Sequence, residues 1–310
     1  MRLRGRRKWR ACGPLAGWVV WAALPFAAGG GEHVAGVAPG FTLAVSETVA
    51  GELNGNDASA GMKAWAEVVA RQMDLRVDPE LCTSAELLQK IRNRQVDSFS
   101  ISVLEFMRVS HYVDPTLVID ESDAPDGQEY LLLVHQAGGI HSLADLRGRN
   151  LVLYQNKRTC LGRIWLDTLL ASAHLGAAAT YLGRVDGNPK LSHVVLPVFF
   201  RQADACLVTR LGYATMCELN PQLAKQLRIL AESPKLLTSF LAFHKDCPPE
   251  TRRKFRAAVT ELHKSVVGRQ ALMLFGSTRL VPVDISALRT SLELLHAYER
   301  LPGKAPLGGQ

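Results

Sequence analysis

A short stretch in the middle of the chain, QNKRTCLG at residues 155–162, places two cations, a hydroxyl and a thiol between an apolar strand and an amphipathic segment. The first N–H groups of a helix have no partner within the helix, and the helix dipole favours negative charge at that end. Lys157, Arg158 and Thr159 would add positive charge and a hydroxyl donor. The stretch therefore predicts an oxyanion site. The alternative interpretation is a capped helix with a solvated basic turn.

The same stretch could support a different chemistry, because Cys160 lies at this helix start beside two cations. A thiol in such a place has a lowered pKa and can act as a nucleophile. An enzyme would also need a base, and neither His174 nor His193 has a spacing that demands contact with Cys160. We therefore expect no catalytic residue, and a thiol-dependent enzyme that uses Cys160 is kept as the less favoured alternative.

A second candidate group follows the apolar segment ADACLVT at 203–209, where Arg210 comes directly after Thr209. An arginine can pair bidentately with a phosphate or a carboxylate, whereas it repels an amine. This group adds Thr209 and Arg210 to the predicted anion site.

A third group lies in the loop after the first strand and contributes Ser46, Glu47 and Asn56. Carboxylates in this loop would bind a cationic part of a solute, a metal ion, or arginines from another part of the fold. The alternative is that Asn56 and Asp57 only cap the next helix, with Asp57 as the N-cap. A metal site has no further support, because no cluster of Cys and His with zinc spacing occurs.

The elements that must position these groups follow from the spacing of the apolar residues. Strands are predicted at 41–46, near 76–81 and at 97–102, and helical periodicity lies between them. A second series of the same kind begins with a strand at 151–154. Alternating strands and helices predict an α/β fold with mostly parallel sheets, in which ligands gather at the carboxyl ends of the strands.

Composition and charge exclude several classes of protein. With 310 residues and 47% apolar content, the chain can bury a substantial core. Its formal charge of +7 is concentrated at the start, because the first ten residues carry six of the cations, and the rest has a charge of +1. A nucleic-acid partner is therefore not expected.

The first 28 residues have the order of regions found in a secretory signal peptide. A basic head precedes the apolar run PLAGWVVWAALPFAA at 14–28, which is short for a membrane-spanning helix. We expect export to the periplasm, with a retained N-terminal anchor as the alternative. Five cysteines follow the signal, and their spacing leaves any disulfide pairing open: Cys82, Cys160, Cys206, Cys217 and Cys247.

Several phrases over residues 41–285 resemble the periplasmic phosphate- and phosphonate-binding proteins of ABC importers, which have the type II solute-binding protein fold. The phrases are QVDSFSIS, IHSLADLRGRNLVLYQNKRT, FFRQADACLVTRLGYATM, LRILAESPKLLTSFLAFHKDCPPETRRKF and LFGSTRLVPVD. The resemblance implies two α/β lobes around a cleft. We expect lobe 1 at 36–135 plus 232–300, lobe 2 at 136–231 and a flexible tail at 301–310. The chain would cross near 134–136 and 231–233.

The resemblance also implies which ligand class fits. Proteins of this type carry a run of small hydroxyl residues where this chain has Arg158, Thr159 and Cys160, so only Thr159 keeps a hydroxyl. Those that bind an aminoalkyl phosphonate have acidic residues where this chain has Thr209 and Arg210. The family's glycine, proline and tyrosine after the third strand fall on Ser102, Val103 and Phe106. These departures argue against an aminoalkyl phosphonate.

Together these observations predict a monomeric, exported solute-binding protein without a cofactor. It would capture phosphate or an amine-free phosphonate and deliver this small anionic solute to an ABC permease in the inner membrane. A periplasmic module that reports its ligand to a membrane sensor is the alternative. The predicted ligand-binding residues are Ser46, Glu47, Asn56, Ser102, Lys157, Arg158, Thr159, Thr209 and Arg210.

Overall fold

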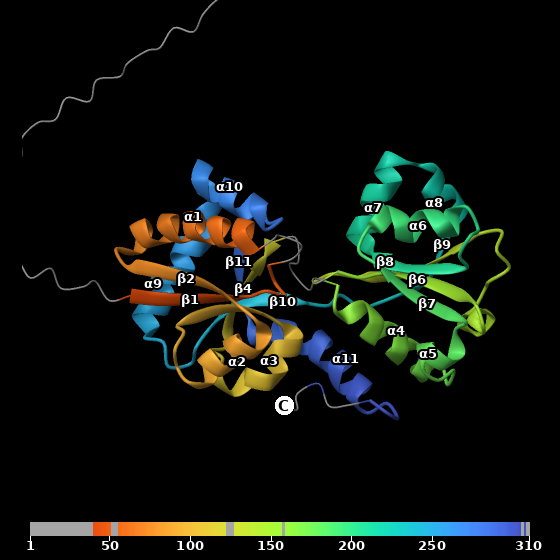
Figure 1. The fold of residues 1–310 in the computed structure, drawn as a ribbon, viewed down its shortest axis with the longest axis horizontal. Coiled ribbons are helices and arrows are strands. Elements are labelled where there is room, and N and C mark those ends of the chain that lie inside the picture. Colours follow the sequence, from red (N-terminus) through yellow and green to blue (C-terminus); the bar gives the residue numbers. More distant parts are fainter. Residues whose placement is uncertain (1–39, 51–54, 122–126, 157–158, 305–306, 308–310) are drawn as a thin grey trace, which may run out of the picture. The chain divides into compact units, whose positions relative to one another are not determined.

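A computed structural model describes residues 40–50, 55–121, 127–156, 159–304 and 307. Figure 1 shows two sheets, each flanked by helices, within the unit formed by residues 38–310. The predicted signal peptide lies outside the described residues, as do Lys157 and Arg158. The helices are α1 (Gly55–Met73), α2 (Ser84–Arg92), α3 (Val103–Val109), α4 (Leu161–Ser172), α5 (Ala178–Tyr181), α6 (Leu191–Phe199), α7 (Arg210–Leu219), α8 (Gln222–Gln226), α9 (Pro249–Glu261), α10 (Val266–Leu274) and α11 (Arg289–Glu299).

The sheet of lobe 1 has the strand order β11-β4-β10-β3-β1-β2. β1 is parallel to β2 and β3, whereas β10 and β11 run antiparallel to their neighbours. The carboxyl ends of β1 to β4 therefore lie at one edge of this sheet. Its strands are β1 (Gly40–Ser46), β2 (Arg76–Cys82), β3 (Ser98–Ser102), β4 (Thr116–Asp120), β10 (Ser239–Phe243) and β11 (Leu280–Asp284).

The sheet of lobe 2 has the strand order β7-β6-β8-β5-β9. β6 is parallel to β7 and β8, and β5 is antiparallel to both β8 and β9. The carboxyl ends of β6 to β9 share one edge with the start of β5. Its strands are β5 (Tyr130–His135), β6 (Asn150–Tyr154), β7 (Arg184–Asn188), β8 (Ala205–Thr209) and β9 (Leu227–Glu232). Two lobes of this kind agree with the predicted fold class.

The first crossing between the lobes differs from the predicted one. β5 belongs to the sheet of lobe 2, so the chain leaves lobe 1 before Tyr130 and not near 134–136. The second crossing lies between β9 and β10, adjoining the predicted 231–233. The crossings run side by side: the Gln128 N–H donates to Leu236 O (2.9 Å), and the Leu236 N–H donates to Gln128 O (2.8 Å).

The apolar core forms on both faces of each sheet because side chains alternate along the strands. On β1, Phe41, Leu43 and Val45 join a cluster with α1, α9 and α10, which we call the α1-side core. Ala44 faces the opposite way, into a second cluster that extends from α2 and α3 through the crossings to α4 in lobe 2. The lobes are thus connected by continuous apolar packing as well as by two chain segments.

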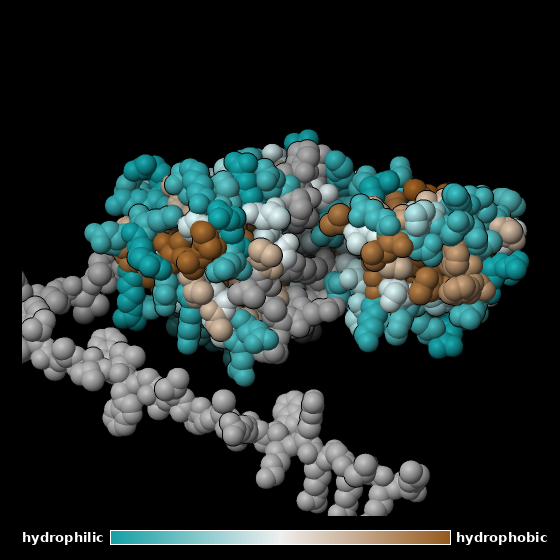
Figure 2. Space-filling model, turned by 90° about the horizontal axis from the view of Figure 1, so that it is seen from above, coloured by the Kyte–Doolittle hydropathy of each residue, from teal (hydrophilic) through white to brown (hydrophobic). Residues whose placement is uncertain are grey.

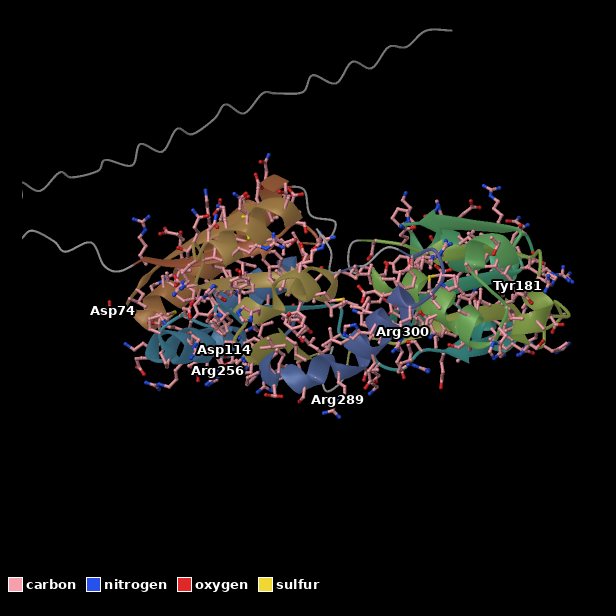
Figure 3. The ribbon with its side chains drawn as sticks, turned by 90° about the horizontal axis from the view of Figure 1, so that it is seen from below. Asp74, Asp114, Tyr181, Arg256, Arg289 and Arg300 are labelled. Atoms are coloured by element: carbon pink, nitrogen blue, oxygen red, sulfur yellow. The ribbon has the colours of Figure 1, made fainter. Side chains whose placement is uncertain are left out.

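The C-terminal part of the chain contacts both lobes. α9 and α10 pack against α1, whereas α11 packs against α4. In Figure 3, Arg289 at the start of α11 and Arg300 just after its end lie between Asp114 of lobe 1 and Tyr181 of lobe 2.

The segment after α11 was expected to be a flexible tail, yet its described residues make specific contacts. Lys304 Nζ donates to the buried Asp167 carboxylate of α4 (2.9 Å), and Arg108 Nε of α3 donates to Leu307 O (3.1 Å). This segment therefore connects α3 of lobe 1 with α4 of lobe 2.

The surface view in Figure 2 is largely hydrophilic, with hydrophobic side chains gathered in a few places. Several large apolar side chains are exposed on α7 and α10. None of the helices within the described residues combines the length and apolar character that a membrane crossing requires. On α7 these are Leu211 and Leu219, and on α10 they are Val266, Val267 and Met273.

Candidate functional site

The carboxyl edge of lobe 1 carries a buried carboxylate, Glu105, that gathers the nearby hydroxyls. Ser46 Oγ, at the end of β1, donates to Glu105 Oε1 (2.5 Å). Thr48 Oγ1 and Ser102 Oγ donate to Glu105 Oε2 (2.9 and 2.8 Å). The structure thus brings together two of the predicted ligand-binding residues, Ser46 and Ser102, but directs both hydroxyls to an anionic side chain of the protein.

Local sequence explains why Glu105 lies there. Ser102 is the N-cap of α3, and the Ser102 N–H donates to Glu105 Oε2 (2.8 Å) while Ser102 Oγ accepts from the Glu105 N–H (3.3 Å). This is a capping box. Its signal is a serine or threonine followed three residues later by a glutamate, and Thr83 and Glu86 show the same signal at α2. Glu105 was not among the predicted residues, although its spacing from Ser102 is a signal in the sequence that identifies it.

Of the residues predicted to bind an anion before α4, Thr159 lies within the described part of the chain. Thr159 is buried, and its Oγ1 donates to Tyr154 O (3.1 Å) and accepts from the Asn156 N–H (2.9 Å). The Thr159 N–H in turn donates to Asn156 Oδ1 (3.0 Å). These bonds hold the turn between β6 and α4, so the Thr159 hydroxyl is already bonded to the backbone of Tyr154 and Asn156.

Cys160 is the N-cap residue of α4 and makes no side-chain capping bond. Burial, with a smaller contribution from the Glu105 carboxylate of lobe 1, raises its pKa to about 12. This direction is opposite to the lowered pKa expected from the sequence. At neutral pH the thiol is protonated, which disfavours Cys160 as a nucleophile.

Thr209 and Arg210 lie at the carboxyl edge of lobe 2. Thr209 is the N-cap of α7, and its Oγ1 accepts from the Gly212 N–H (3.2 Å). The Arg210 guanidinium pairs through Nε with Glu129, just before β5, and through Nη2 with Glu232 at the end of β9 (2.5 Å). Burial lowers the pKa of Arg210, but both carboxylates outweigh it, and the net shift is upward.

Of the residues predicted in the first loop, Glu47 and Asn56 lie at the surface, whereas Ser46 is buried. Glu47 is exposed, and its N–H donates to Cys82 O (3.0 Å). Asn56 is exposed in the first turn of α1. Asp57 is not the N-cap that we expected, because α1 already begins at Gly55. Neither Glu47 nor Asn56 takes part in the bonds that hold Glu105.

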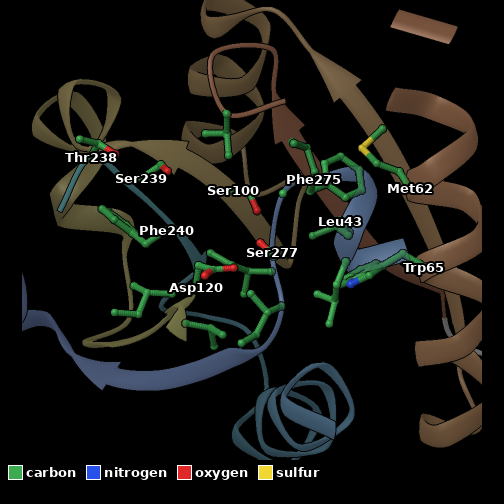
Figure 4. A pocket seen from close by; sticks show the side chains of 18 of the residues that line it. Leu43, Met62, Trp65, Ser100, Asp120, Thr238, Ser239, Phe240, Phe275 and Ser277 are labelled. Atoms are coloured by element: carbon green, nitrogen blue, oxygen red, sulfur yellow. The ribbon is translucent and has the colours of Figure 1, made fainter. Parts of the chain in front are cut away.

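A cavity of about 260 Å³ lies in lobe 1, on the face of the sheet that α1 and α10 cover (Figure 4). Its walls include Leu43, Met62, Trp65 and Phe275, and Leu211 of lobe 2 also lines it. In the sequence, Met62 and Trp65 are three positions apart, which indicates one face of a helix but does not predict a cavity. Among the described residues, His, Cys, Asp and Glu side chains form no group of three or more that could hold a metal ion.

Comparison with known sequences identifies the family of this protein. The family described as ABC transporter, phosphonate, periplasmic substrate-binding protein matches residues 51–288. The chain belongs to this family. It is therefore the solute-binding component of an ABC transport system, a class that carries substrates and does not convert them. No curated protein matches the sequence significantly.

Solved structures agree on the fold. A Xanthomonas citri protein bound to ATP is 16% identical, with a TM-score of 0.61, over 84% of this chain and 97% of that one. PhnD1 from Prochlorococcus marinus in complex with methylphosphonate is 12% identical (TM-score 0.57; 84% and 99%). The binding-protein component of a Pseudomonas aeruginosa ABC phosphonate transporter is 15% identical (TM-score 0.53; 84% and 87%).

Proposed function

We propose that this chain is exported by its first 28 residues, acts as a monomer in the periplasm, and captures phosphate or an amine-free phosphonate for an ABC permease. The position of Arg210 is the observation that supports this class of ligand. A guanidinium stands at the carboxyl edge of lobe 2, where the resemblance places acidic residues in proteins that bind aminoalkyl phosphonates. It favours an oxyanion and repels an ammonium group. The family and the methylphosphonate held by PhnD1 support the same class.

The two ion pairs of Arg210 determine how anion binding should respond to mutation. Glu129 and Glu232 hold the guanidinium through Nε and Nη2, yet the Arg210 side chain remains 44% exposed. An oxyanion that binds Arg210 would compete with these two carboxylates. Removing their charge should therefore strengthen anion binding, and removing Arg210 should weaken it.

Calorimetric titration with phosphate, methylphosphonate and aminoethylphosphonate tests the proposal. We expect the first two to bind the parent protein and the amine to bind more weakly. Arg210→Gln should lower oxyanion affinity by about ten- to a hundred-fold, the worth of a charge-assisted hydrogen bond. The double variant Glu129→Gln/Glu232→Gln should raise it.

Arg149→Gln is the matched control. Arg149 lies at the opposite edge of the same sheet, pairs with Asp204 (3.4 Å) and is 48% exposed. It should leave affinity unchanged. Equal oxyanion affinity in the parent and in Arg210→Gln would show that Arg210 does not bind the ligand. If neither oxyanion binds the parent protein, the proposed ligand class is wrong.

A further inference from the structure

The floor of the lobe 1 cavity is formed by one row of cross-strand partners in the sheet. Val45 pairs with Ser100, Ser100 with Leu241, and Leu241 with Val118. The three apolar members of this row belong to the α1-side core. Cross-strand partners share one face of a sheet, so Ser100 faces the same side as they do. All four line the cavity.

The sequence of β3 explains why a hollow forms at this place. β3 reads SFSIS, and Phe99 and Ile101 belong to the core cluster on the opposite face. The face toward α1 receives only serines from this strand. A serine fills much less space than the valine and leucine that flank Ser100 in its row. Protein interiors are otherwise close-packed, and the missing volume lies above Ser100.

Much of the apolar wall above this floor comes from the helices and from the residues that follow them. Met62 and Trp65 of α1 are almost fully buried, at 3% and 6% exposure, and Phe275 follows α10 (Figure 4). Among the described residues that line the cavity, Asp120 is the only charged one. Apolar cavities of about 150 Å³ exclude water and bind molecules such as benzene. A cavity of about 260 Å³ has room for a phenyl ring or a hexyl chain.

The polar lining residues lie toward the carboxyl edge of the sheet. Asp120 follows Val118 by two positions on β4, and Ser239 precedes Leu241 by two positions on β10. Residues two apart on a strand share a face, so the lining changes from apolar to polar toward the edge that carries Ser102. This gradient matches a solute whose apolar body enters the cavity. The Asp120 carboxylate repels an oxyanion, so the charged head of such a solute would stay outside the cavity.

We propose that the cavity above Ser100 receives an alkyl or aryl substituent of the solute. The ligand is then an organic oxyanion with an apolar group, and inorganic phosphate fills only part of the site. This inference deepens the proposed function and rests on it for the oxyanion head. The cavity itself rests on the sheet register and the composition of β3.

The test is calorimetric titration with methyl-, propyl-, hexyl- and phenylphosphonate, and with n-hexanol as an uncharged probe. Ser100→Ile fills the cavity with a residue suited to a strand, and Ser100→Val is a smaller change in case the isoleucine disturbs folding. Ser110→Ile is the control, because Ser110 is exposed and does not line the cavity.

In the parent protein, each added methylene should strengthen binding about four-fold until the cavity is full, since a buried methylene is worth about 0.8 kcal/mol. Ser100→Ile and Ser100→Val should reduce this gain and leave methylphosphonate affinity unchanged, while Ser110→Ile retains the gain. Hexanol should bind the parent and not Ser100→Ile.

The outcomes separate the two proposals. If methylphosphonate binds but hexylphosphonate binds no more tightly, the cavity inference is wrong and the proposed function stands. A gain that persists in both Ser100 variants also overturns it. If no phosphonate or phosphate binds, yet hexanol binds in a manner that Ser100→Ile abolishes, the oxyanion function is wrong and the cavity is a binding site for apolar groups.

Discussion

Ser46 and Glu105 lie 59 positions apart in the sequence, and the Ser46 hydroxyl donates a 2.5 Å hydrogen bond to the buried Glu105 carboxylate. This bond joins the end of β1 to the first turn of α3. A carboxylate that accepts from several hydroxyls stabilises them in one arrangement, because a bond to a charged group is worth more than a neutral one. Glu105 therefore organises the carboxyl edge of lobe 1.

Glu105→Gln should lower the free energy of unfolding by about 2 kcal/mol, because an amide replaces the charge and turns an N–H₂ group toward hydroxyl donors. Urea denaturation measures the change. Glu86→Gln is the matched control, since Glu86 occupies the same motif at α2 on the surface. Its effect should be much smaller, and equal effects for the two variants would contradict a special role for Glu105.

Gly127→Ala should destabilise the first crossing. Gly127 has a φ of +106°, and a Cβ there would lie 2.2 Å from the backbone carbon of Leu236 in the second crossing. Strain and overpacking together predict a loss of about 3 kcal/mol in chemical denaturation. Gly139→Ala shares the positive φ (+69°) but meets nothing within 4 Å. If both variants lose the same stability, the close approach to Leu236 is unimportant.

Lys304→Met should cost about 2 kcal/mol of stability, because the Asp167 carboxylate is buried and loses a charged partner. The remaining ion pair with Arg163, at 3.5 Å, limits the loss. Lys264→Met, which breaks an exposed pair with Glu261, is the control and should have little effect. Comparable melting temperatures for Lys304→Met and the parent would mean that the last segment does not stabilise the fold.

Cys160 predicts a dependence of stability on alkaline pH. Its folded pKa of about 12 lies above the ordinary value of 9.0 for an unfolded thiol. As pH rises, the Cys160 thiol loses its proton in the unfolded chain before it does so in the folded protein. Its contribution to the free energy of unfolding is therefore fully present below pH 9 and is lost as pH rises toward 12. Urea denaturation from pH 8 to pH 10.5 should show a steeper loss for the parent than for Cys160→Ala. Parallel curves would contradict the raised pKa.

Sequence patterns predicted well those elements that depend only on residues close together in the chain. Apolar periodicity identified β1, α1 and β3, and the carboxyl-edge rule placed Ser46 and Ser102 at one edge. β5 was assigned to the wrong lobe because YLLLV is buried on both faces. Such a strand shows no alternation of apolar and polar residues, so its sequence does not indicate which strands it pairs with. Its partners are β8 and β9, which lie far along the chain.

The candidate site was harder to predict, since residue type does not reveal where a side chain is already bound. Thr159 and Arg210 have the right chemistry for an anion, but Thr159 bonds to its own turn and Arg210 pairs with Glu129 and Glu232. The partners of Arg210 are 81 and 22 positions away. The cavity depends on a register across four strands, which the serines of β3 alone do not predict.

The position of β10 between β3 and β4 has a consequence for how the chain folds. The sheet of lobe 2 uses only residues 130–232, so it can form as soon as that segment is available. Lobe 1 cannot join β3 to β4 until residues 239–243 arrive. Closing such a long loop is slow, and unfinished edges can aggregate. We therefore expect lobe 2 to fold first, with β1 to β4 exposed as an incomplete sheet until the last third of the chain docks.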